Sequence, residues 1–198
     1  MSRTQDEGKL INEEKNLSQV CAQQKATDRE IQENPELARQ MKTIRFTLNG
    51  RPRQLTVDMR LSLLEMLRND CGMTSVKRGC EVGECGACTV LINDEPFDSC
   101  IYLAIWADGK DLTTLEGLEG PHGELSDLQQ AFVDEAALQC GYCTPGFIMA
   151  AEAIFRAGKR LSRDEIRRQI AGNLCRCTGY VNIIKAIEKV MDQRFGPA

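Results

Sequence analysis

Eight of the ten cysteines in the 198-residue sequence fall into two groups of four. The first group follows a C-x4-C-x2-C pattern, with a fourth thiol twelve residues after the third. The second group consists of two close pairs, in the segments LQCGYCTPG and GNLCRCTGY. Thiols clustered in this way are typical ligands of metal ions and iron–sulfur clusters. The first group comprises Cys80, Cys85, Cys88 and Cys100, and the second comprises Cys140, Cys143, Cys175 and Cys177.

The spacing of the first group is that of plant-type [2Fe-2S] proteins, although its fourth cysteine follows sooner than in ordinary plant ferredoxins. Three thiolates on one loop must surround a small inorganic cluster, whose sulfides accept hydrogen bonds from backbone N–H groups. Gly79, Gly83 and Gly86 allow the unusual dihedral angles and the close approach that such a loop needs. The first group therefore predicts a [2Fe-2S] site.

The second group places a condition on the local backbone. Residues two apart share a face of an extended chain but lie on nearly opposite sides of a helix. If Cys175 and Cys177 bind one cluster, the preceding helix must end near Leu174 and the CRC segment must be irregular. Cys140 and Cys143 span one turn before a predicted helix, so both thiols can point at the same centre.

Two four-cysteine zinc sites and disulfides are the alternatives to two iron–sulfur clusters. Structural zinc favours C-x2-C pairs, and disulfides are rare in the reducing compartment that the absence of an export signal indicates. The single histidine, His122, excludes a Rieske centre, which needs two. It is expected on the surface of a linker, and Cys21 and Cys71 are expected to be plain thiols.

The composition excludes some partners. The formal net charge of −4 and the pI near 5.2 give no electrostatic reason to expect nucleic acid or an anionic membrane. No apolar run approaches the length of a membrane span. A cytoplasmic protein is therefore expected, with neither nucleic acid nor membrane as partner.

The periodicity of the chain predicts an α+β fold in four parts. Residues 1–40 have no aromatic residue and many charges, and form either a disordered tail or a helical arm that becomes ordered on a partner. Residues 41–115 contain alternating strands, turns at Asn49-Gly50 and Asn93-Asp94, one helix capped by Ser62 with Glu65, and the cysteine loop: a small mixed sheet.

Glycines and a proline in EGLEGPHGE make residues 116–124 the predicted linker. Residues 125–198 then contain four predicted helical runs. Ser126 with Gln129 and Ser162 with Glu165 are capping-box pairs, and Thr144-Pro145 is a helix start. The apolar positions at helical spacing predict a shared core; they are Phe147, Ala151, Ile154, Phe155, Ile166, Ile170, Leu174, Ile184, Ile187 and Met191.

Three segments together resemble a known family: GCEVGECGACTVLIND, QCGYCTPGFIMA and GNLCRCTGY, in this order. They are similar to the small iron–sulfur subunit, or N-terminal domain, of the xanthine oxidase family of molybdenum hydroxylases, over about residues 42–192. The resemblance implies a plant ferredoxin-like β-grasp domain followed by a four-helix-bundle domain, each with one [2Fe-2S] cluster. Residues 1–40 lie outside the resemblance.

The resemblance also implies a function within a heterotrimer. Electrons would pass from a molybdopterin cofactor on a large subunit, through the second group of cysteines and then the first, to FAD on a medium subunit. Gln139 and Cys177 would contact the pterin, although Gln139 is equally explained as a polar helix-end residue. No nucleophile–base constellation stands out, so the residues that act on the substrate are expected on the partner subunits. The expected assembly is a dimer of heterotrimers.

The substrate is less defined. The run SCIYLAIWADGK is most similar to bacterial xanthine dehydrogenase-type subunits and favours a purine-like N-heterocycle. Aldehyde, nicotinate, aromatic acyl-CoA and carbon monoxide enzymes share the core motifs and remain alternatives, as do a free two-cluster ferredoxin-like carrier and a zinc-stapled interaction module. Arg176, between two ligands, would either stabilise a reduced cluster or act only as an exposed, solubilising charge.

Overall fold

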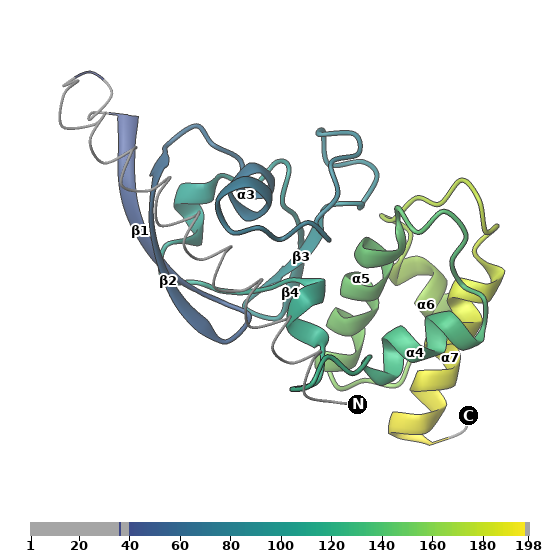
Figure 1. The fold of residues 1–198 in the computed structure, drawn as a ribbon. Helices are drawn as coiled ribbons and strands as arrows, with labels where there is room; N and C mark the ends of the chain where they lie inside the picture. Colours follow the sequence, from purple (N-terminus) through teal and green to yellow (C-terminus); the bar gives the residue numbers. More distant parts are fainter. Residues whose placement is uncertain (1–35, 37–39, 197–198) are drawn as a thin grey trace, which may run out of the picture.

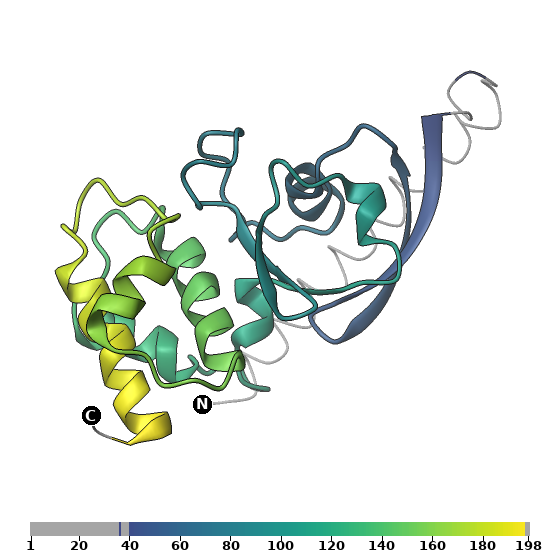
Figure 2. The same ribbon diagram turned by 180° about the vertical axis from the view of Figure 1, so that it is seen from behind.

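The computed structural model describes residue 36 and residues 40–196, which form two halves lying side by side (Figures 1 and 2). The first half is a five-stranded sheet with short helical turns, and the second consists of four helices, so the expected α+β class is present. The predicted arm, with Cys21, lies outside the described residues except for Glu36 and Gln40. None of the described helices is both long and apolar enough to cross a membrane.

The sheet is mixed, as predicted. Its strands are β1 (Met41–Leu48), β2 (Arg51–Asp58), β3 (Thr89–Ile92), β4 (Glu95–Asp98) and β5 (Asp111–Thr113). They lie in the order β2-β1-β5-β3-β4; β1 and β5 run parallel, and the other neighbours run antiparallel. Ile44, Phe46 and Leu48 are buried while the residues between them are more exposed, which confirms the alternation in β1.

Two-residue turns close both hairpins. Asn49 and Gly50 have φ angles of 52° and 75°, and Asn93 and Asp94 have φ angles of 51° and 69°. Positive φ at both central positions gives a turn whose twist matches that of the flanking strands. The turn after β3 matters for function because it brings the chain back antiparallel and so fixes where β4 ends.

The predicted helix after β2 is shorter and less regular than expected. It consists of α3 (Leu63–Glu65) and a π-helical turn, η1 (Met66–Asp70). The Ser62 hydroxyl accepts a hydrogen bond from the Glu65 N–H at 3.2 Å, but the Glu65 carboxylate binds Asn69 and Arg78 instead of returning to Ser62. The predicted capping box is therefore only half formed.

Two further turns of 3-10 helix, η2 (Ala104–Ala107) and η3 (Leu115–Leu118), lead to the second half. η3 overlaps the start of the predicted linker. Its Glu116 accepts hydrogen bonds from the Ser75 N–H and hydroxyl and from the Thr114 hydroxyl. The start of this connection is thus fastened to the sheet half.

The second half contains α4 (Asp127–Asp134), α5 (Thr144–Arg156), α6 (Arg163–Gln169) and α7 (Val181–Phe195). Both predicted capping boxes are present, and Pro145 lies in the first turn of α5. The four helices share one hydrophobic core, which includes the predicted positions from Phe147 to Met191 with one exception. α5 also packs against β3 and β4, and so joins the two halves.

The exception is Leu174, whose side chain is 54% exposed. α6 ends at Gln169, five residues before the predicted end, and residues 171–180 are irregular. Leu174 therefore has no place on a helical face, and its prediction as a core residue is wrong. The prediction that the CRC segment is irregular is confirmed.

The start of α4 offers a test of local stability. The Ser126 hydroxyl accepts from the Gln129 N–H at 3.2 Å, and the Gln129 side chain accepts from the Ser126 N–H at 2.8 Å. Ser126→Ala should lower the free energy of unfolding by about 1 kcal/mol, whereas Ser126→Gly should lower it by only a few tenths. Denaturant titration checks this, and equal losses in both variants would contradict a capping role.

Candidate iron–sulfur sites

The first group of cysteines is assembled by one loop and one hairpin. Cys80, Cys85 and Cys88 lie on the loop that joins η1 to β3, and Cys100 lies in the turn after β4. Because β3 and β4 are antiparallel, with Thr89 opposite Asp98, the thiols just before β3 and just after β4 meet at one end of the hairpin.

Backbone N–H groups point at the sulfurs of this loop. Cys80 Sγ accepts from the N–H groups of Val82 at 3.5 Å and Glu84 at 3.3 Å, and Cys85 Sγ accepts from the Cys80 N–H at 3.4 Å. The first two hydrogen bonds lower the pKa of Cys80 to about 7. The loop is therefore folded to stabilise negative sulfur, which both a thiolate ligand and a cluster require.

Glycines make this loop conformation accessible, as predicted. Gly83 and Gly86 have φ angles of 76° and 65°, in the left-handed region. A Cβ atom added at Gly79 would lie 2.7 Å from Cys85 Sγ, so a side chain there would displace a candidate ligand.

Cys88 is set deeper than the rest of its group. Its thiol donates to Asp98 Oδ1 at 3.7 Å, and burial raises the pKa of Cys88 to about 12. Burial likewise raises the pKa of Asp98. A metal that displaces the thiol proton would compensate for this burial.

The second group comes from two irregular segments that face each other. Cys140 lies in the turn before α5, and Cys143 is the N-cap residue of α5. Cys175 and Cys177 lie between α6 and α7, and Cys177 Sγ is 3.7 Å from Cys140 Sγ. The Thr178 N–H and hydroxyl donate to Cys175 Sγ at 3.4 Å and 3.1 Å.

The pKa values of the thiols in this group shift in different directions. Burial, together with the neighbouring Cys175 thiol, raises the pKa of Cys143 to about 12. Burial also opposes ionisation of Cys175, but the two hydrogen bonds from Thr178 outweigh it and lower its pKa. Contact with Cys140 raises the pKa of Cys177. The hydrogen bonds from Thr178 thus favour the thiolate form of Cys175.

The thiols approach in pairs, and the pairs suit a two-iron cluster. Two thiolates on one tetrahedral metal, each about 2.3 Å from it, lie about 3.8 Å apart, close to the 3.7 Å between Cys140 and Cys177. Among the described residues, no three His, Cys, Asp or Glu side chains gather around a single point as they would around one metal ion. The contacting pairs are Cys80 with Cys85, Cys88 with Cys100, Cys140 with Cys177, and Cys143 with Cys175.

Both groups lie at the same end of the molecule, where the two halves meet (Figures 1 and 2). The Leu174 N–H donates to the Cys85 carbonyl at 2.9 Å, so a residue next to one group is hydrogen-bonded to a residue of the other. The two candidate sites are thus connected directly through the backbone.

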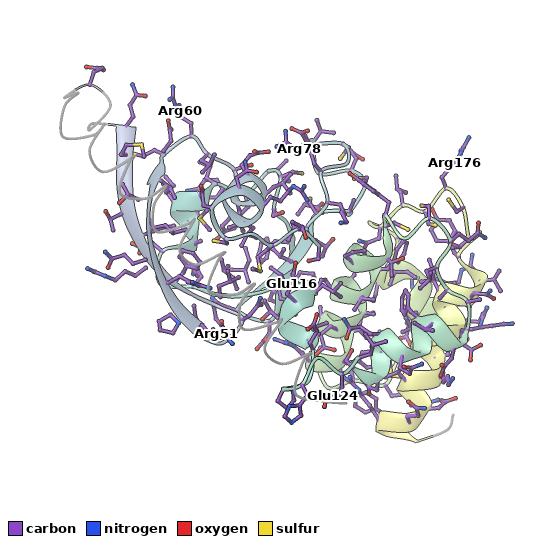
Figure 3. The ribbon with its side chains drawn as sticks, in the orientation of Figure 1. Arg51, Arg60, Arg78, Glu116, Glu124 and Arg176 are labelled. Atoms are coloured by element: carbon purple, nitrogen blue, oxygen red, sulfur yellow. The ribbon has the colours of Figure 1, made fainter. Side chains whose placement is uncertain are left out.

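The remaining predicted residues take surface or core positions. Gln139 is exposed beside Cys140. Arg176 points away from its loop into solvent (Figure 3). His122 is exposed in the turn before α4. Cys71 is buried in the core of the sheet half, in agreement with its prediction as a plain thiol.

Sequence reasoning missed three residues at the sites: Thr178, which stabilises a thiolate, and Tyr142 and Asn173, which bond across to the first loop. Of these three, only Thr178 could have been identified from the sequence, because a hydroxyl close to a cysteine commonly donates a hydrogen bond to its sulfur.

Cys71 should be chemically inert in the folded protein. Burial raises its pKa to about 12, so little thiolate forms near pH 8, and the side chain is 9% exposed. A maleimide should modify Cys71 only after unfolding, as mass spectrometry of the peptide would show. Labelling of Cys71 in the native holoprotein as fast as in denaturant would contradict this.

Two family models match the chain. Residues 46–112 match a 2Fe-2S iron-sulfur cluster binding domain, and residues 114–188 match a [2Fe-2S] binding domain. The xanthine dehydrogenase iron-sulfur-binding subunit of Escherichia coli O157:H7 is 53% identical over 147 residues, covering 73% of this chain and 91% of the relative. The nicotinate dehydrogenase small FeS subunit of Eubacterium barkeri is 45% identical over 151 residues, covering 76% and 96%.

Solved structures of related oxidoreductases also match most of this chain. Quinoline 2-oxidoreductase from Pseudomonas putida 86 matches with a TM-score of 0.74 and 45% identity, over 77% of this chain and 93% of the matched chain. Aldehyde oxidoreductase from Desulfovibrio gigas matches with a TM-score of 0.73 and 37% identity, over 77% of this chain and 17% of the larger one. The chain carries two [2Fe-2S]-binding domains and belongs to the iron–sulfur subunits of the xanthine oxidase family of molybdenum hydroxylases.

Proposed function

We propose that this chain relays electrons from a molybdopterin centre on a large subunit to FAD on a medium subunit of a molybdenum hydroxylase. The observation that carries the proposal is the presence of two paired four-thiol sites at one end of the molecule, joined by a backbone hydrogen bond. A [2Fe-2S] cluster, when bound, supplies a one-electron redox centre. The chain itself holds the clusters, donates hydrogen bonds to their sulfur ligands and fixes their separation.

We assign all eight paired cysteines as ligands, four to each cluster, and no catalytic residue for the substrate to this chain. The domains are residues 41–115, a β-grasp, and residues 125–198, a four-helix bundle, joined by a linker at 116–124. The shared core of α4 to α7 supports the bundle. The matches of separate family models to the two halves support the division.

Gln139 and Cys177 form the proposed contact with the pterin. Both are exposed, and Cys177 touches Cys140, which follows Gln139 in the chain. They therefore belong to one surface beside the second site. The complex would be a cytoplasmic heterotrimer or a dimer of heterotrimers.

A purine of the xanthine type is the proposed substrate of the complex. The support is the 53% identity to a xanthine dehydrogenase subunit, against 45% for a nicotinate dehydrogenase subunit and 39% for an aldehyde oxidoreductase subunit. The small differences among these relatives keep nicotinate and aldehydes as the competing substrates, because the substrate pocket would lie on the large subunit.

Purification of the tagged chain from its native cells tests the proposal. We expect co-purification of two larger subunits with molybdenum and FAD, EPR signals of two distinct [2Fe-2S] clusters after reduction, and oxidation of hypoxanthine or xanthine. A colourless, zinc-containing chain would refute the iron–sulfur assignment. A stable two-cluster monomer without partners would instead identify a free carrier, and turnover of nicotinate or an aldehyde alone would refute the purine.

A further inference from the structure

Side chains as well as backbone tie the two cysteine loops together. Asn173, two residues before Cys175, donates through Nδ2 to the Gly86 carbonyl at 2.9 Å and to Thr89 Oγ1 at 3.1 Å. Tyr142, between Cys140 and Cys143, donates its hydroxyl to the Arg78 carbonyl at 2.5 Å. Each tie joins a residue of the second loop to a residue beside the first site.

The contact between the two halves beside Gly86 is too tight for one half to slide along the other. Asn173 is buried, and a Cβ atom added at Gly86 would lie 2.4 Å from its Nδ2 atom. A Cβ atom added at Gly146, in the first turn of α5, would lie 2.2 Å from the Gly86 carbonyl oxygen. The backbones of the two halves therefore touch at the point where Asn173 binds.

The acceptors are themselves held in place. Thr89 begins β3, and its hydroxyl also donates to the Gly86 carbonyl at 2.7 Å. The Arg78 side chain is paired with Glu65 and Glu81, which restrains the backbone that accepts from Tyr142. The second loop is thus fastened to fixed points of the sheet half.

The covalent linker cannot replace these ties. Glu124, near its end, lies at the end of the molecule opposite Arg78 and Arg176 (Figure 3). A small rotation of one half about the end of the linker would displace the cysteine loops, because they lie at the opposite end of the molecule from Glu124 (Figure 3). At the sites themselves, the hydrogen bonds of Asn173, Tyr142 and the Leu174 N–H oppose that rotation, together with the close contact of Gly146 with Gly86.

We propose that Asn173 and Tyr142 are positioning residues that latch the two loops together and thereby set the rate of electron transfer between the clusters. With both clusters bound, Cys140, Cys143, Cys175 and Cys177 would hold the donor of one electron, Cys80, Cys85, Cys88 and Cys100 would hold its acceptor, and no atom would be transferred. Neither side chain donates to a ligand sulfur in the structure; both act through the first loop and β3. The inference rests on the proposed two-cluster function.

Two variants test the latch in the holoenzyme complex. Asn173→Asp keeps the shape of the side chain but places a carboxylate oxygen against the Gly86 carbonyl, and Tyr142→Phe removes one hydroxyl. The matched controls are Tyr102→Phe, which loses a hydrogen bond to the Trp106 carbonyl within the sheet half, and Asn182→Asp, which loses a hydrogen bond to the Ala136 carbonyl within the helical half.

The readouts are the rate of inter-cluster equilibration after rapid one-electron reduction and the magnetic interaction between the two reduced clusters in EPR. We expect both cluster signals to persist, the rate to fall about tenfold in Asn173→Asp and by less in Tyr142→Phe, and the magnetic splitting to change. The rate falls because electron tunnelling between two centres weakens steeply as the distance between them grows, and a loosened contact lets the two loops move apart. The controls should match the wild type in both readouts.

An unchanged rate and splitting in both variants would overturn the latch. If Asn173→Asp loses a cluster, the result for Tyr142→Phe decides. A slower inter-cluster rate in Tyr142→Phe with both clusters present supports the latch, and a wild-type rate in that variant refutes it. Failure of the proposed function would appear separately, as fewer than two clusters in the wild-type spectrum.

Discussion

Cys143→Ala should abolish one [2Fe-2S] signal and leave the other, with the iron content of the purified chain falling by about half. Cys143 pairs with Cys175 at the N-terminus of α5, so its loss leaves one iron with a single thiolate from this chain. The first group of cysteines lies on a different loop and hairpin and keeps all four thiols. EPR of the reduced protein and iron analysis measure both effects.

Cys71→Ala is the matched control. This thiol is buried, whereas Cys143 is half-buried; it lies in the sheet core away from both groups, and its loss removes only a small volume. Both clusters should remain, with a loss of about 1 kcal/mol in stability. Loss of both signals in Cys143→Ala would show that the two sites do not assemble independently, and retention of both would remove Cys143 from the ligand set.

Gly146→Ala should destabilise the protein strongly. The new methyl group would lie 2.2 Å from the Gly86 carbonyl oxygen, and this neighbour is backbone that cannot rotate away. Overpacking of this kind costs about 3 kcal/mol, more than the roughly 1 kcal/mol that alanine gains over glycine within a helix. The midpoint of denaturant unfolding should fall. A lower slope of the unfolding free energy against denaturant concentration would show that the two halves separate before they unfold.

Gly172→Ala is the paired control because Gly172 also lies against Gly86: a Cβ atom added at Gly86 would lie 2.7 Å from the Gly172 carbonyl oxygen. A Cβ atom there meets nothing within 4 Å, and the residue does not have positive φ. Its stability should equal or exceed that of the wild type. A Gly146→Ala variant as stable as Gly172→Ala would mean that the two halves can separate slightly without cost.

The sequence by itself determined the features that depend on neighbours along the chain. The period-two pattern of Ile44, Phe46 and Leu48, the turn at Asn49-Gly50 and the capping box at Ser126 all involve residues within a few positions of one another. The spacing of the cysteines belongs to the same class, because a loop ligand set is largely a local pattern. These predictions are borne out in the structure, or, for the ligands, remain proposals that the thiol pairs support.

Only the tertiary structure decided which residues from distant segments meet. Glu65 leaves its predicted capping role because Arg78, thirteen residues on, competes for its carboxylate. Leu174 is exposed because α6 ends early and the chain turns toward Cys85. Asn173 bonds to Gly86 across 87 residues because α5 packs on β3 and β4 and brings the loops together. Such contacts follow from the packing of whole elements, which no local pattern of residues specifies.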